Sequence, residues 1–572
     1  MANGASLPVD VATLFRAALT CHSENRRPEA EALYRQLLDH APDHAQSLGM
    51  LAMILTDGAD EVEAEAVLLR HLALRPHDGG SLYGLGRLKA RQGDDEAAAS
   101  LFQRAAQWLP RLAPIFNDLG VSLHRLGRGD EAMVALDRAI DLEPAYAVAH
   151  GNRGVALFDL GRFDEAFDAQ LAVLVNTAPA STELRASALE NLGRAARKAG
   201  RLAEAGALAS AQVEVGDLDA NLVEQLGLIL EDADHQAEAS ALRNDFARRA
   251  GVQRSGRATG AEATVLLLGA VGGGHVPIRY LVDPARFAAL SVSILSPDQA
   301  DAPLGSIDIE ALGKVDVVFN TLGDVDHDGG RLAAANALCA RLGKPVLNSP
   351  TMIPRTGRDR APELFAGIAG LVTPKVTRSS PAELRDLAIE APLLVRPAGD
   401  HGGENLVLLR DDADKRAYVS GGPNDRLLLT AFHDFRSADG LWRKYRLIFV
   451  DRRVYPYHLA IAGGWLVHYW RAEMGRSDWK RAEEERFLAD WRGVFGAPAV
   501  AAIEEVARRL DLDYGGMDCA LTDDGRGILF EANACILVHL DEPAARFAYK
   551  HQYVPPIREA FSRMLLDRAG AG

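Results

Sequence analysis

The sequence has few cysteines, and none is placed as a zinc ligand or a disulfide partner would be. Only four occur in 572 residues, and no two form a CxxC pair; they are Cys21, Cys339, Cys519 and Cys535. Zinc sites need closely spaced cysteine and histidine ligands, and disulfide scaffolds need many cysteines in a short chain. We therefore expect neither a zinc knuckle nor a disulfide framework.

Long apolar runs are also missing. Nowhere do 18 apolar residues follow one another, and the N-terminal residues MANGASLPVDVATLFRAALT lack the basic start and continuous apolar segment of a secretory signal. The sequence thus predicts no contact with a membrane. We expect a cytoplasmic protein.

Positive charge is in deficit. The chain has 63 Lys and Arg residues against 79 Asp and Glu, a formal net charge of -16. Proteins that neutralise nucleic-acid phosphates usually carry the opposite balance, so we expect no nucleic-acid partner. With 48% hydrophobic and 25% charged residues the composition is that of a folded globular protein, and the length favours several domains.

A period of 34 residues runs through the first part of the chain. Proline recurs at this spacing, at Pro42, Pro76, Pro110 and Pro144. Alanine keeps the same period, at Ala30, Ala64, Ala98, Ala132 and Ala166. Each period is typical of a helix, a short turn and a second helix, which proline ends because it lacks a backbone donor and clashes with the preceding turn. Such units bury their apolar faces only by stacking, so we predict an all-α solenoid.

Residues 10 to 250 resemble the tetratricopeptide repeat (TPR) family, because several positions keep register together. The sequence departs from that family in lacking the bulky aromatic residue of most first helices. About seven repeats are predicted, and we assign residues 1–250 to them. Packing explains the repeated residues, but the concave groove of such solenoids often binds peptides. A peptide or protein segment in this groove is therefore the expected partner.

Beyond a predicted linker at 251–261 the 34-residue period stops and the residue pattern changes. Short β-branched segments such as TVLLLGAV and VDVVFN alternate with helical ones, so residues 262–350 are predicted to form an open α/β domain. The glycine-rich segment GAVGGGH follows the first of these strands. It is typical either of a phosphate-binding loop or of a tight turn with close backbone packing.

The segment DYGGMDCALTDDGRGILFEANA predicts a hairpin that carries acidic residues. Its DG pair favours a two-residue turn, which pairs Asp523 with Arg526 and, counting outward, Asp518 with Glu531. Asn533 lies two residues beyond Glu531 and shares its face, because side chains alternate along a strand. Three oxygen-bearing side chains are therefore expected to meet on one side of the sheet.

Two opposed carboxylates repel each other, so a positive group should lie between them. A magnesium ion fits, since it takes few hard oxygen ligands and shares the rest of its coordination with nucleotide phosphates. The alternative is a solvent-facing hairpin with hydrated carboxylates. Against it, the same register places Ala520 and Leu529 on the face of the two acids, which would then stand on an apolar floor.

This hairpin closely resembles the metal-binding hairpin of the ATP-grasp superfamily, in which an aspartate, a glutamate and an asparagine hold magnesium. By this resemblance those roles fall on Asp518, Glu531 and Asn533. Two further segments support the resemblance in the expected order. LLVRPAGDHGGENLVLL resembles the strand and glycine-rich loop over the phosphates, and KYRLIFVDRRVYPY resembles the central strand with its arginine, Arg446.

The resemblance extends over roughly residues 262 to 565. It implies an α/β pre-ATP-grasp domain at 262–350 and an α+β ATP-grasp fold at 351–572. It also implies residues that bind the cofactor ATP, namely Arg358, Arg396, His401, Gly402 and Gly403.

Two of these positions depart from the family, which usually has lysine where this chain has Arg358 and Arg396. Arginine keeps the charge and binds phosphate oxygens bidentately, so the resemblance still implies ATP binding, with changed geometry. The plainer interpretations are a surface arginine at a strand end for Arg396 and a structural ion pair for Arg446. Lone histidines on strands, such as His458, are more often core residues. A nucleophilic Cys535 is not favoured, because nothing nearby identifies a base.

The function implied is an ATP-dependent carboxylate–amine ligase that works through an acyl phosphate. Arg396 and Arg446 would balance the growing negative charge, and the repeats would recruit a peptide or protein substrate. The alternative is an interaction scaffold whose ATP-grasp domain binds nucleotide without turnover, and phosphoryl transfer without ligation is a third possibility. The sequence identifies neither the carboxylate nor the amine.

Overall fold

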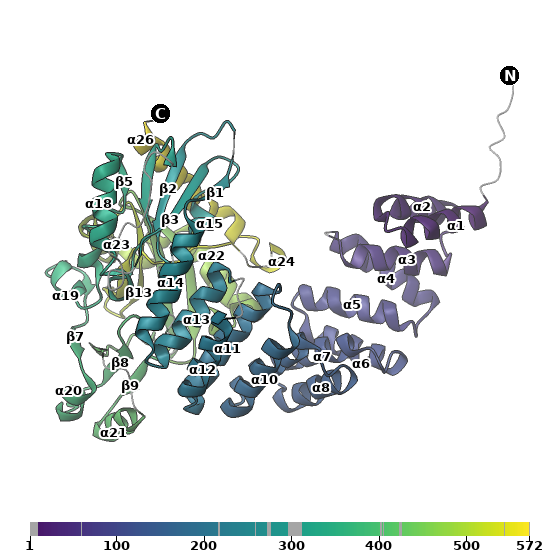
Figure 1. Cartoon of the computed structure of the whole chain (residues 1–572), viewed down its shortest axis with the longest axis horizontal. Coiled ribbons are helices and arrows are strands. Elements are labelled where there is room, and N and C mark those ends of the chain that lie inside the picture. The colour runs from purple at the N-terminus through teal and green to yellow at the C-terminus, as the bar shows by residue number, and fades with distance from the viewer. Residues whose placement is uncertain are drawn as a thin grey trace. The chain divides into compact units, whose positions relative to one another are not determined.

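The computed structural model describes residues 10–570, apart from 59, 215–217, 258, 272–275, 296–311, 401–402, 404, 422–425, 541 and 543. The chain forms two compact units, Met1–Gln236 and Ala237–Gly572 (Figure 1). The boundary between them falls inside residues 1–250, the region that the sequence assigns to the repeats. Each unit has hydrophobic clusters of its own.

The first unit is a solenoid in which helices follow one another as stacked pairs (Figure 1), so the predicted all-α architecture is confirmed. Its helices are α1 (Val11–Ser23), α2 (Arg27–His40), α3 (Ala45–Thr56), α4 (Glu61–Leu74), α5 (Gly79–Arg91), α6 (Asp95–Trp108), α7 (Ala113–Arg125), α8 (Gly129–Leu142), α9 (Ala147–Asp159), α10 (Phe163–Asn176), α11 (Thr182–Ala199), α12 (Leu202–Glu214) and α13 (Ala220–Asp232). Helix α14 (Gln236–Ala250) begins at the boundary between the units.

The 34-residue period has the structural meaning that the sequence predicts. Helices α2, α4, α6 and α8 each end two residues before one of the periodic prolines. The periodic alanines are buried where helices pack: Ala30, Ala64, Ala98 and Ala132 are 0% exposed and Ala166 is 1% exposed. Glycine serves the same close packing, because Gly86 of α5 lies against the ring of Phe102 in α6.

Replacing Gly86 by alanine should destabilise the solenoid, although alanine is the better helix former. A Cβ atom at Gly86 would lie 2.5 Å from Cε1 of Phe102, so the aromatic ring has to move. We expect Gly86→Ala to lower the free energy of unfolding by about 1 to 3 kcal/mol in urea titrations followed by circular dichroism.

The control is Gly80→Ala in the same helix. Gly80 is exposed, and a Cβ there would meet nothing closer than 3.5 Å. Alanine should therefore leave stability unchanged or raise it, by up to about 1 kcal/mol. Equal midpoints for the two variants would contradict the packing role of Gly86.

The second unit begins with an open sheet that confirms the predicted α/β domain. Its strand order is β1 (Gln253–Gly256), β3 (Ala288–Ser293), β2 (Thr264–Gly269), β4 (Val317–Asn320) and β5 (Val346–Leu347), and only β1 pairs antiparallel. Strand β1 lies within 251–261, the range predicted as a linker. The glycine-rich segment after β2 lies largely outside the described residues.

Two further sheets are largely antiparallel. One has the order β7 (Val376–Ser379), β10 (Leu427–Ala431), β8 (Leu393–Pro397) and β9 (Val407–Leu409). The other has the order β12 (Arg453–Ala462), β11 (Trp442–Val450), β13 (Tyr514–Leu521), β14 (Gly527–Asn533) and β6 (Leu371–Val372), of which only β6 pairs parallel. The first of these sheets has a small core of its own, formed with helix α20 (Pro381–Asp386).

Helices complete the second unit. The longer ones are α18 (Leu332–Leu342), α21 (Asp412–Ser420), α22 (Asp478–Ala489), α23 (Trp491–Leu510) and α26 (Pro555–Ala569). Short helices that matter for the site are α17 (Val325–Asp328), η2 (Ile353–Thr356), α19 (Ala361–Leu364) and α25 (Lys550–Tyr553). Phe561 of α26 packs on Phe319 of β4 and on Tyr514 of β13, so this helix joins the open sheet to the sheet that carries the predicted hairpin.

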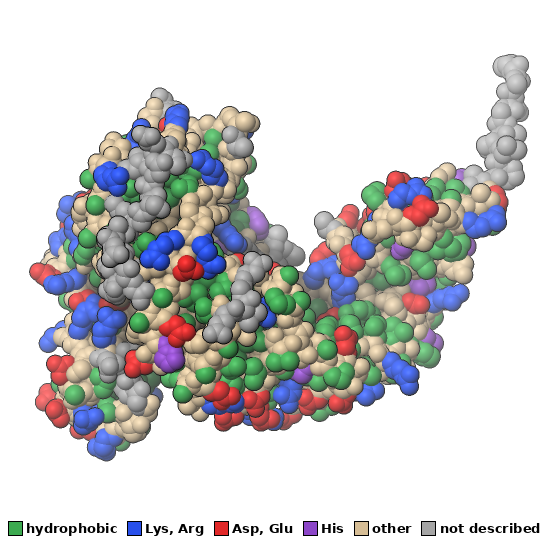
Figure 2. Space-filling view, in the orientation of Figure 1, with side chains coloured by type: hydrophobic (Ala, Val, Ile, Leu, Met, Phe, Trp, Pro, Cys, Tyr) green, Lys and Arg blue, Asp and Glu red, His purple; other side chains and the backbone are tan. Residues whose placement is uncertain are grey.

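Lys and Arg side chains are interspersed with Asp and Glu on the face that Figure 2 shows. Among the described helices, none has a stretch of 18 residues apolar enough to cross a membrane.

Candidate functional site

The turn between β13 and β14 is one residue longer than the sequence predicts. Thr522 pairs with Arg526, because Thr522 N donates to Arg526 O at 2.9 Å and Gly525 N donates to Thr522 O at 2.9 Å. Gly525 has φ +78°, a left-handed conformation that glycine adopts without strain. The predicted two-residue turn with an Asp523–Arg526 pair is therefore wrong, since the chain forms a three-residue loop closed by glycine.

A β-bulge further along the hairpin restores the predicted pairing of the acids. Asp518 pairs with Glu531, but the register shifts between Asp518 and Cys519, so Cys519 pairs with Leu529. Phe530 is thus the extra residue on β14. The predicted Asp518–Glu531 pair is confirmed, and it results from two deviations that cancel.

Because of the bulge, the apolar residues beside the two acids pair differently from the prediction. Ala520 pairs with Ile528, not with Leu529 as the sequence predicts. Ala520, Ile528 and Leu529 are all buried, and Asp518 is only 2% exposed. The alternative of a solvent-facing hairpin therefore does not apply to Asp518.

The acids belong to a row of polar side chains across four strands. In the strand pairings His458 of β12 faces Arg446 of β11, Arg446 faces Asp518 of β13, and Asp518 faces Glu531 of β14. Directly paired residues project from the same face of a sheet. Burial holds the pKa of His458 well below its ordinary value, so the four side chains are neutral, positive, negative and negative in that order across the face.

Asp518 is held by two cations of the neighbouring strand. Arg446 binds it bidentately, with Nε 2.6 Å from Oδ1 and Nη2 2.9 Å from Oδ2, and Lys444 places Nζ 3.0 Å from Oδ2. Burial would raise the pKa of Asp518, but Arg446 and Lys444 outweigh it and hold the pKa well below its ordinary value. Both carboxylate oxygens are thus engaged by positive side chains.

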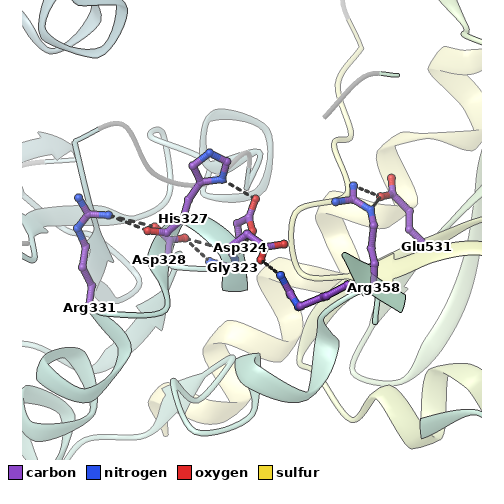
Figure 3. Close-up of polar contacts among 9 residues, drawn as sticks. Gly323, Asp324, His327, Asp328, Arg331, Arg358 and Glu531 are labelled. Carbon is purple, nitrogen blue, oxygen red and sulfur yellow. Dashed lines mark hydrogen bonds and ion pairs between the residues drawn. The ribbon is translucent and has the colours of Figure 1, made fainter. Parts of the chain in front are cut away.

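Glu531 is held from the other side. Arg358, in the loop after η2, donates from Nε to Oε2 at 3.1 Å and from Nη2 to the same oxygen, and Figure 3 shows the two side chains facing each other. Burial would lower the pKa of Arg358, but the charge of Glu531 outweighs it and raises the pKa. The positive charge that two opposed carboxylates require is therefore supplied by side chains of the chain itself.

The third predicted metal ligand is also engaged. Asn533 shares the face of Glu531, and its Oδ1 accepts a hydrogen bond of 2.8 Å from Cys535 N. The predicted gathering of three oxygen donors on one face is present. Over the described part of the chain, His, Cys, Asp and Glu form no group of three or more that could hold a metal ion.

Arg396 differs from the other arginines of the site because two of its donor atoms have no hydrogen-bond partner. It lies on β8, and its Nε and Nη2 atoms are buried without a hydrogen-bond partner. Burial, followed by the nearby charge of Arg358, lowers the pKa of Arg396 to about 10, and Glu531, Asp400 and Asp324 oppose this shift. Arg396 is therefore a half-buried cation near a second cation, and its buried Nε and Nη2 atoms lack an acceptor.

A loop at the end of β4 borders this cluster. Asp328 of α17 fixes the loop, because its Oδ2 accepts from Gly323 N at 3.0 Å and from Asp324 N at 3.1 Å (Figure 3). Asp324 in turn lies 3.0 Å from Nδ1 of His327. A small pocket lies between this loop and the end of β14, with Asp324, Arg358 and Asn533 in its wall.

Arg378 ties the smaller antiparallel sheet to this loop. From β7 it donates to Asp359 through Nε at 3.0 Å and Nη2 at 2.9 Å, and to Oδ1 of Asp326 through Nη1 at 2.7 Å. Three segments that are distant in sequence therefore meet at one guanidinium.

The remaining predicted residues have different outcomes. His401 and Gly402 lie outside the described residues, while Gly403 has φ +76° and lies near Leu466. His458 is buried and stacks on Tyr469, with ring centroids 4.5 Å apart, as expected of a core histidine. Cys535 is 8% exposed.

Sequence reasoning missed Lys444, Asp324 and Arg378. Lys444 could have been found, because it lies two residues before Arg446 and therefore projects from the same face. Asp324 and Arg378 belong to other elements, and their approach depends on tertiary packing. No local pattern predicts it.

Comparison with known proteins identifies the repeats. Residues 23–79 and 117–183 match the tetratricopeptide repeat family. Both matched stretches lie in the first unit, which is thus a TPR-like solenoid. A comparison with curated proteins gave no match.

Several solved structures are similar to part of the chain. One is MamA from Desulfovibrio magneticus RS-1, with 17% identity, a TM-score of 0.28, and coverage of 30% of this chain and 97% of that chain. Another is YrrB, described as a TPR protein with an unusual peptide-binding site, at 19% identity, a TM-score of 0.28, and coverage of 31% and 90%. PilW, a type IV pilus biogenesis factor, has 23% identity, a TM-score of 0.29, and coverage of 35% and 91%.

Removing the charge of Asp518 should destabilise the second unit strongly. Asp518→Asn leaves Arg446 and Lys444 without their counter-ion in the middle of the sheet, and breaking such a pair costs about 3 to 5 kcal/mol. Because the pKa of Asp518 is lowered, its contribution is lost only as the pH falls below the ordinary aspartate range. The loss in free energy of unfolding should therefore be the same at pH 7 and pH 5.

Asp524→Asn is the control. Asp524 lies at the exposed turn of the same hairpin and pairs with Arg526 on the surface. Its replacement should change stability little. Equal losses for the two variants, or a loss for Asp518→Asn that disappears at pH 5, would contradict the buried ion pair.

Proposed function

We propose that the second unit binds ATP and uses it to join a carboxylate to an amine, as a ligase of the ATP-grasp kind. The observation that carries this proposal is Arg396, whose Nε and Nη2 atoms are buried and have no hydrogen-bond partner. Leaving such donors unsatisfied is costly, so the site is suited to an anion that supplies acceptors. A nucleotide phosphate has the required charge and oxygens.

The surroundings of Arg396 support a phosphate site. The strand and loop that carry it resemble the phosphate-covering segment of ATP-grasp enzymes, and Gly399 and Gly403 in that loop have positive φ angles. The loop after Arg396 lies against the segment that holds Asp324, because a Cβ at Gly399 would be 2.6 Å from Cε1 of His327, and the charge of Arg358 adds to burial in lowering the pKa of Arg396. Two arginines from separate elements can thus bind the same phosphate group.

The reaction would proceed in two steps. A carboxylate oxygen of the substrate attacks the γ-phosphorus of ATP, and the bond from this phosphorus to the β,γ-bridging oxygen breaks, which yields an acyl phosphate and ADP. The amine nitrogen then attacks the acyl carbon, the carbon–oxygen bond to phosphate breaks, and the amine loses a proton. Neither step requires a nucleophile from the protein, so the demands are alignment and charge neutralisation.

The side chains would divide these tasks. Arg396 and Arg358 bind the phosphate oxygens and balance the charge that grows on them. Arg446 is committed to Asp518, and its Nη1 lies 3.4 Å from Leu537 O. Its role is therefore to fix Asp518 and the loop after β14 in place.

Magnesium is the cation that the resemblance implies for Asp518, Glu531 and Asn533. Their oxygens are chemically suitable and lie on one face. Asp518 does not fit as a ligand in this arrangement, however, since both of its oxygens are held by Arg446 and Lys444. The two steps above are accordingly assigned to the side chains alone.

The second candidate is a scaffold whose second unit binds nucleotide without turnover. Two observations favour it: Arg358 and Arg396 stand where ATP-grasp enzymes usually have lysine, and Asp518 is locked in an ion pair. ATP-dependent phosphate release with a panel of carboxylates and amines separates the candidates. Mass spectrometry of the product separates ligation, which loses water, from phosphoryl transfer, which adds phosphate.

The repeats would recruit a peptide or protein substrate. A groove of about 440 Å³ lies on helices α1, α3 and α5, with Phe15, Leu19, Met50 and Met53 among its apolar walls and Arg75 and Asp78 at its polar side. Leu19 is 36% and Met53 60% exposed, so apolar surface is available to a partner. Such surface is typical of a protein-binding site.

Loss of Arg396 should abolish ATP-dependent phosphate release. Arg396→Met keeps the apolar stem and removes the donors for phosphate, so we expect a fall of about 100-fold or more in turnover. Arg410→Met is the control, because Arg410 is exposed and pairs with Asp414 on the surface. Turnover that is equal in Arg396→Met and in the control would refute the phosphate role.

A charge in the groove should weaken substrate recruitment. Met53→Asp places a carboxylate on the apolar wall, so we expect KM for a protein substrate to rise about tenfold, the equivalent of 1.4 kcal/mol, with kcat unchanged. The control is Val62→Asp, since Val62 is 82% exposed and lies outside the groove wall. Unchanged KM in Met53→Asp would show that the repeats do not present the substrate through this groove.

A further inference from the structure

The buried groups of the site that have no hydrogen-bond partner are mainly donors. Arg396 leaves Nε and Nη2 unused. The buried carboxylate oxygen without a hydrogen bond, Asp328 Oδ1, lies 3.8 Å from the guanidinium of Arg331 and is thus compensated by a charge. A site arranged for a cation presents free oxygens, whereas a site arranged for an anion presents free N–H groups.

The carboxylates near Arg396 do not meet its need. Glu531 is bound to Arg358, Asp400 accepts a hydrogen bond of 2.6 Å from Asn405, and Asp324 lies against His327. Each acid already has a partner other than Arg396. None of these three carboxylates of the described residues is left for Nε and Nη2 of Arg396, so we assign their acceptor to a ligand.

The predicted metal ligands are committed in a way that is costly to reverse. Freeing Asp518 for a metal ion would leave Arg446 and Lys444 buried beside an added divalent charge. Freeing Asn533 would break its hydrogen bond to Cys535 N. Freeing Glu531 would leave Arg358 without its counter-ion near Arg396, whose pKa is already lowered by burial and then by the charge of Arg358.

We propose that this site binds an oligophosphate as the free anion, through Arg396 and Arg358, and that binding requires no divalent cation. The inference rests on the proposed function, because it names the form in which the nucleotide binds. Arg396 and Arg358 supply the positive charge that a metal ion would otherwise supply between the phosphate and the carboxylates. Guanidinium groups suit this role, since they bind phosphate oxygens bidentately and stay charged.

The first test compares ATP binding to the full chain with and without metal. Titration calorimetry in EDTA and in excess Mg²⁺ should give Kd values within about threefold of each other, because the contacts are made by arginine. Inorganic tripolyphosphate should compete with ATP in EDTA, which separates phosphate recognition from recognition of the adenine. Mn²⁺, followed by its electron paramagnetic resonance signal, should not bind to the protein alone.

In the second test, one substitution is expected to have opposite effects on ATP binding in an arginine-based site and in a metal site. Glu531→Gln removes the carboxylate that engages Arg358, so ATP binding in EDTA should tighten by about three- to tenfold as Arg358 becomes available. If Glu531 were a metal ligand, the same variant would weaken binding in Mg²⁺. The control is Glu505→Gln on α23, which removes a surface carboxylate paired with Arg508 and Arg509 and should leave Kd unchanged.

Substitutions of Arg396 complete the design. Arg396→Gln should weaken ATP binding in EDTA by at least about 30-fold, and Arg396→Lys should lose less, since it keeps the charge but not the fork of donors. Arg410→Gln is the matched control. Circular dichroism verifies that each variant is folded.

The outcomes separate the two proposals. Binding that needs Mg²⁺, or weakening by Glu531→Gln, would overturn the metal-free inference and leave the proposed ATP-dependent function standing. Absence of binding in both conditions would overturn both. Equal Kd values in EDTA and Mg²⁺, with tightening by Glu531→Gln, would establish an arginine-based phosphate site.

Discussion

The buried pair of Arg446 and Asp518 is the constraint on which the second unit depends. Two charges in the middle of a sheet are tolerated only when they are paired with good geometry, so strands β11 and β13 must meet in the register that brings these residues together. That register also brings Lys444 to the free side of Asp518. Glu531 is paired directly with Asp518 in the sheet. Its own cation is Arg358, in a loop 173 residues away in sequence. Sheet register and loop position thus follow from one requirement for charge balance.

The sequence predicted best what is set by local periods. A 34-residue repeat places alanines and glycines where helices cross and prolines where they end, and both properties depend on residues a few turns apart. The hairpin shows the limit of such counting. Its acids pair as predicted, but a longer turn and a bulge at Phe530 both intervene, and neither has a signal that outweighs the preference of DG for a two-residue turn. The correctly predicted pairing of the two acids therefore does not show that the predicted two-residue turn is wrong.

The sequence correctly predicted that the opposed carboxylates need a positive charge. It could not identify which group supplies that charge. Opposed carboxylates require positive charge, and a bound magnesium ion was the natural prediction while the neighbours of the hairpin were unknown. The neighbours come from strand order and tertiary packing: β11 lies beside β13, and the loop after η2 lies against β14. Arg446 was expected to serve either in catalysis or in a structural ion pair, and the structure shows the ion pair. Its partner was the residue assigned to the metal.

Arg396 carries the functional argument because packing does not explain it. Every other charged side chain of the row and its surroundings described above lies against a partner of opposite charge or a hydrogen-bonding group. A buried guanidinium beside a second arginine loses hydration and gains repulsion, and the fold must offset that cost elsewhere. Groups held in such unfavourable settings cluster at binding and catalytic sites, where a bound ligand provides the missing hydrogen-bond acceptor or opposite charge. The missing partner has to be anionic, rich in oxygen and able to accept from a planar fork, and a phosphate group meets each of these conditions.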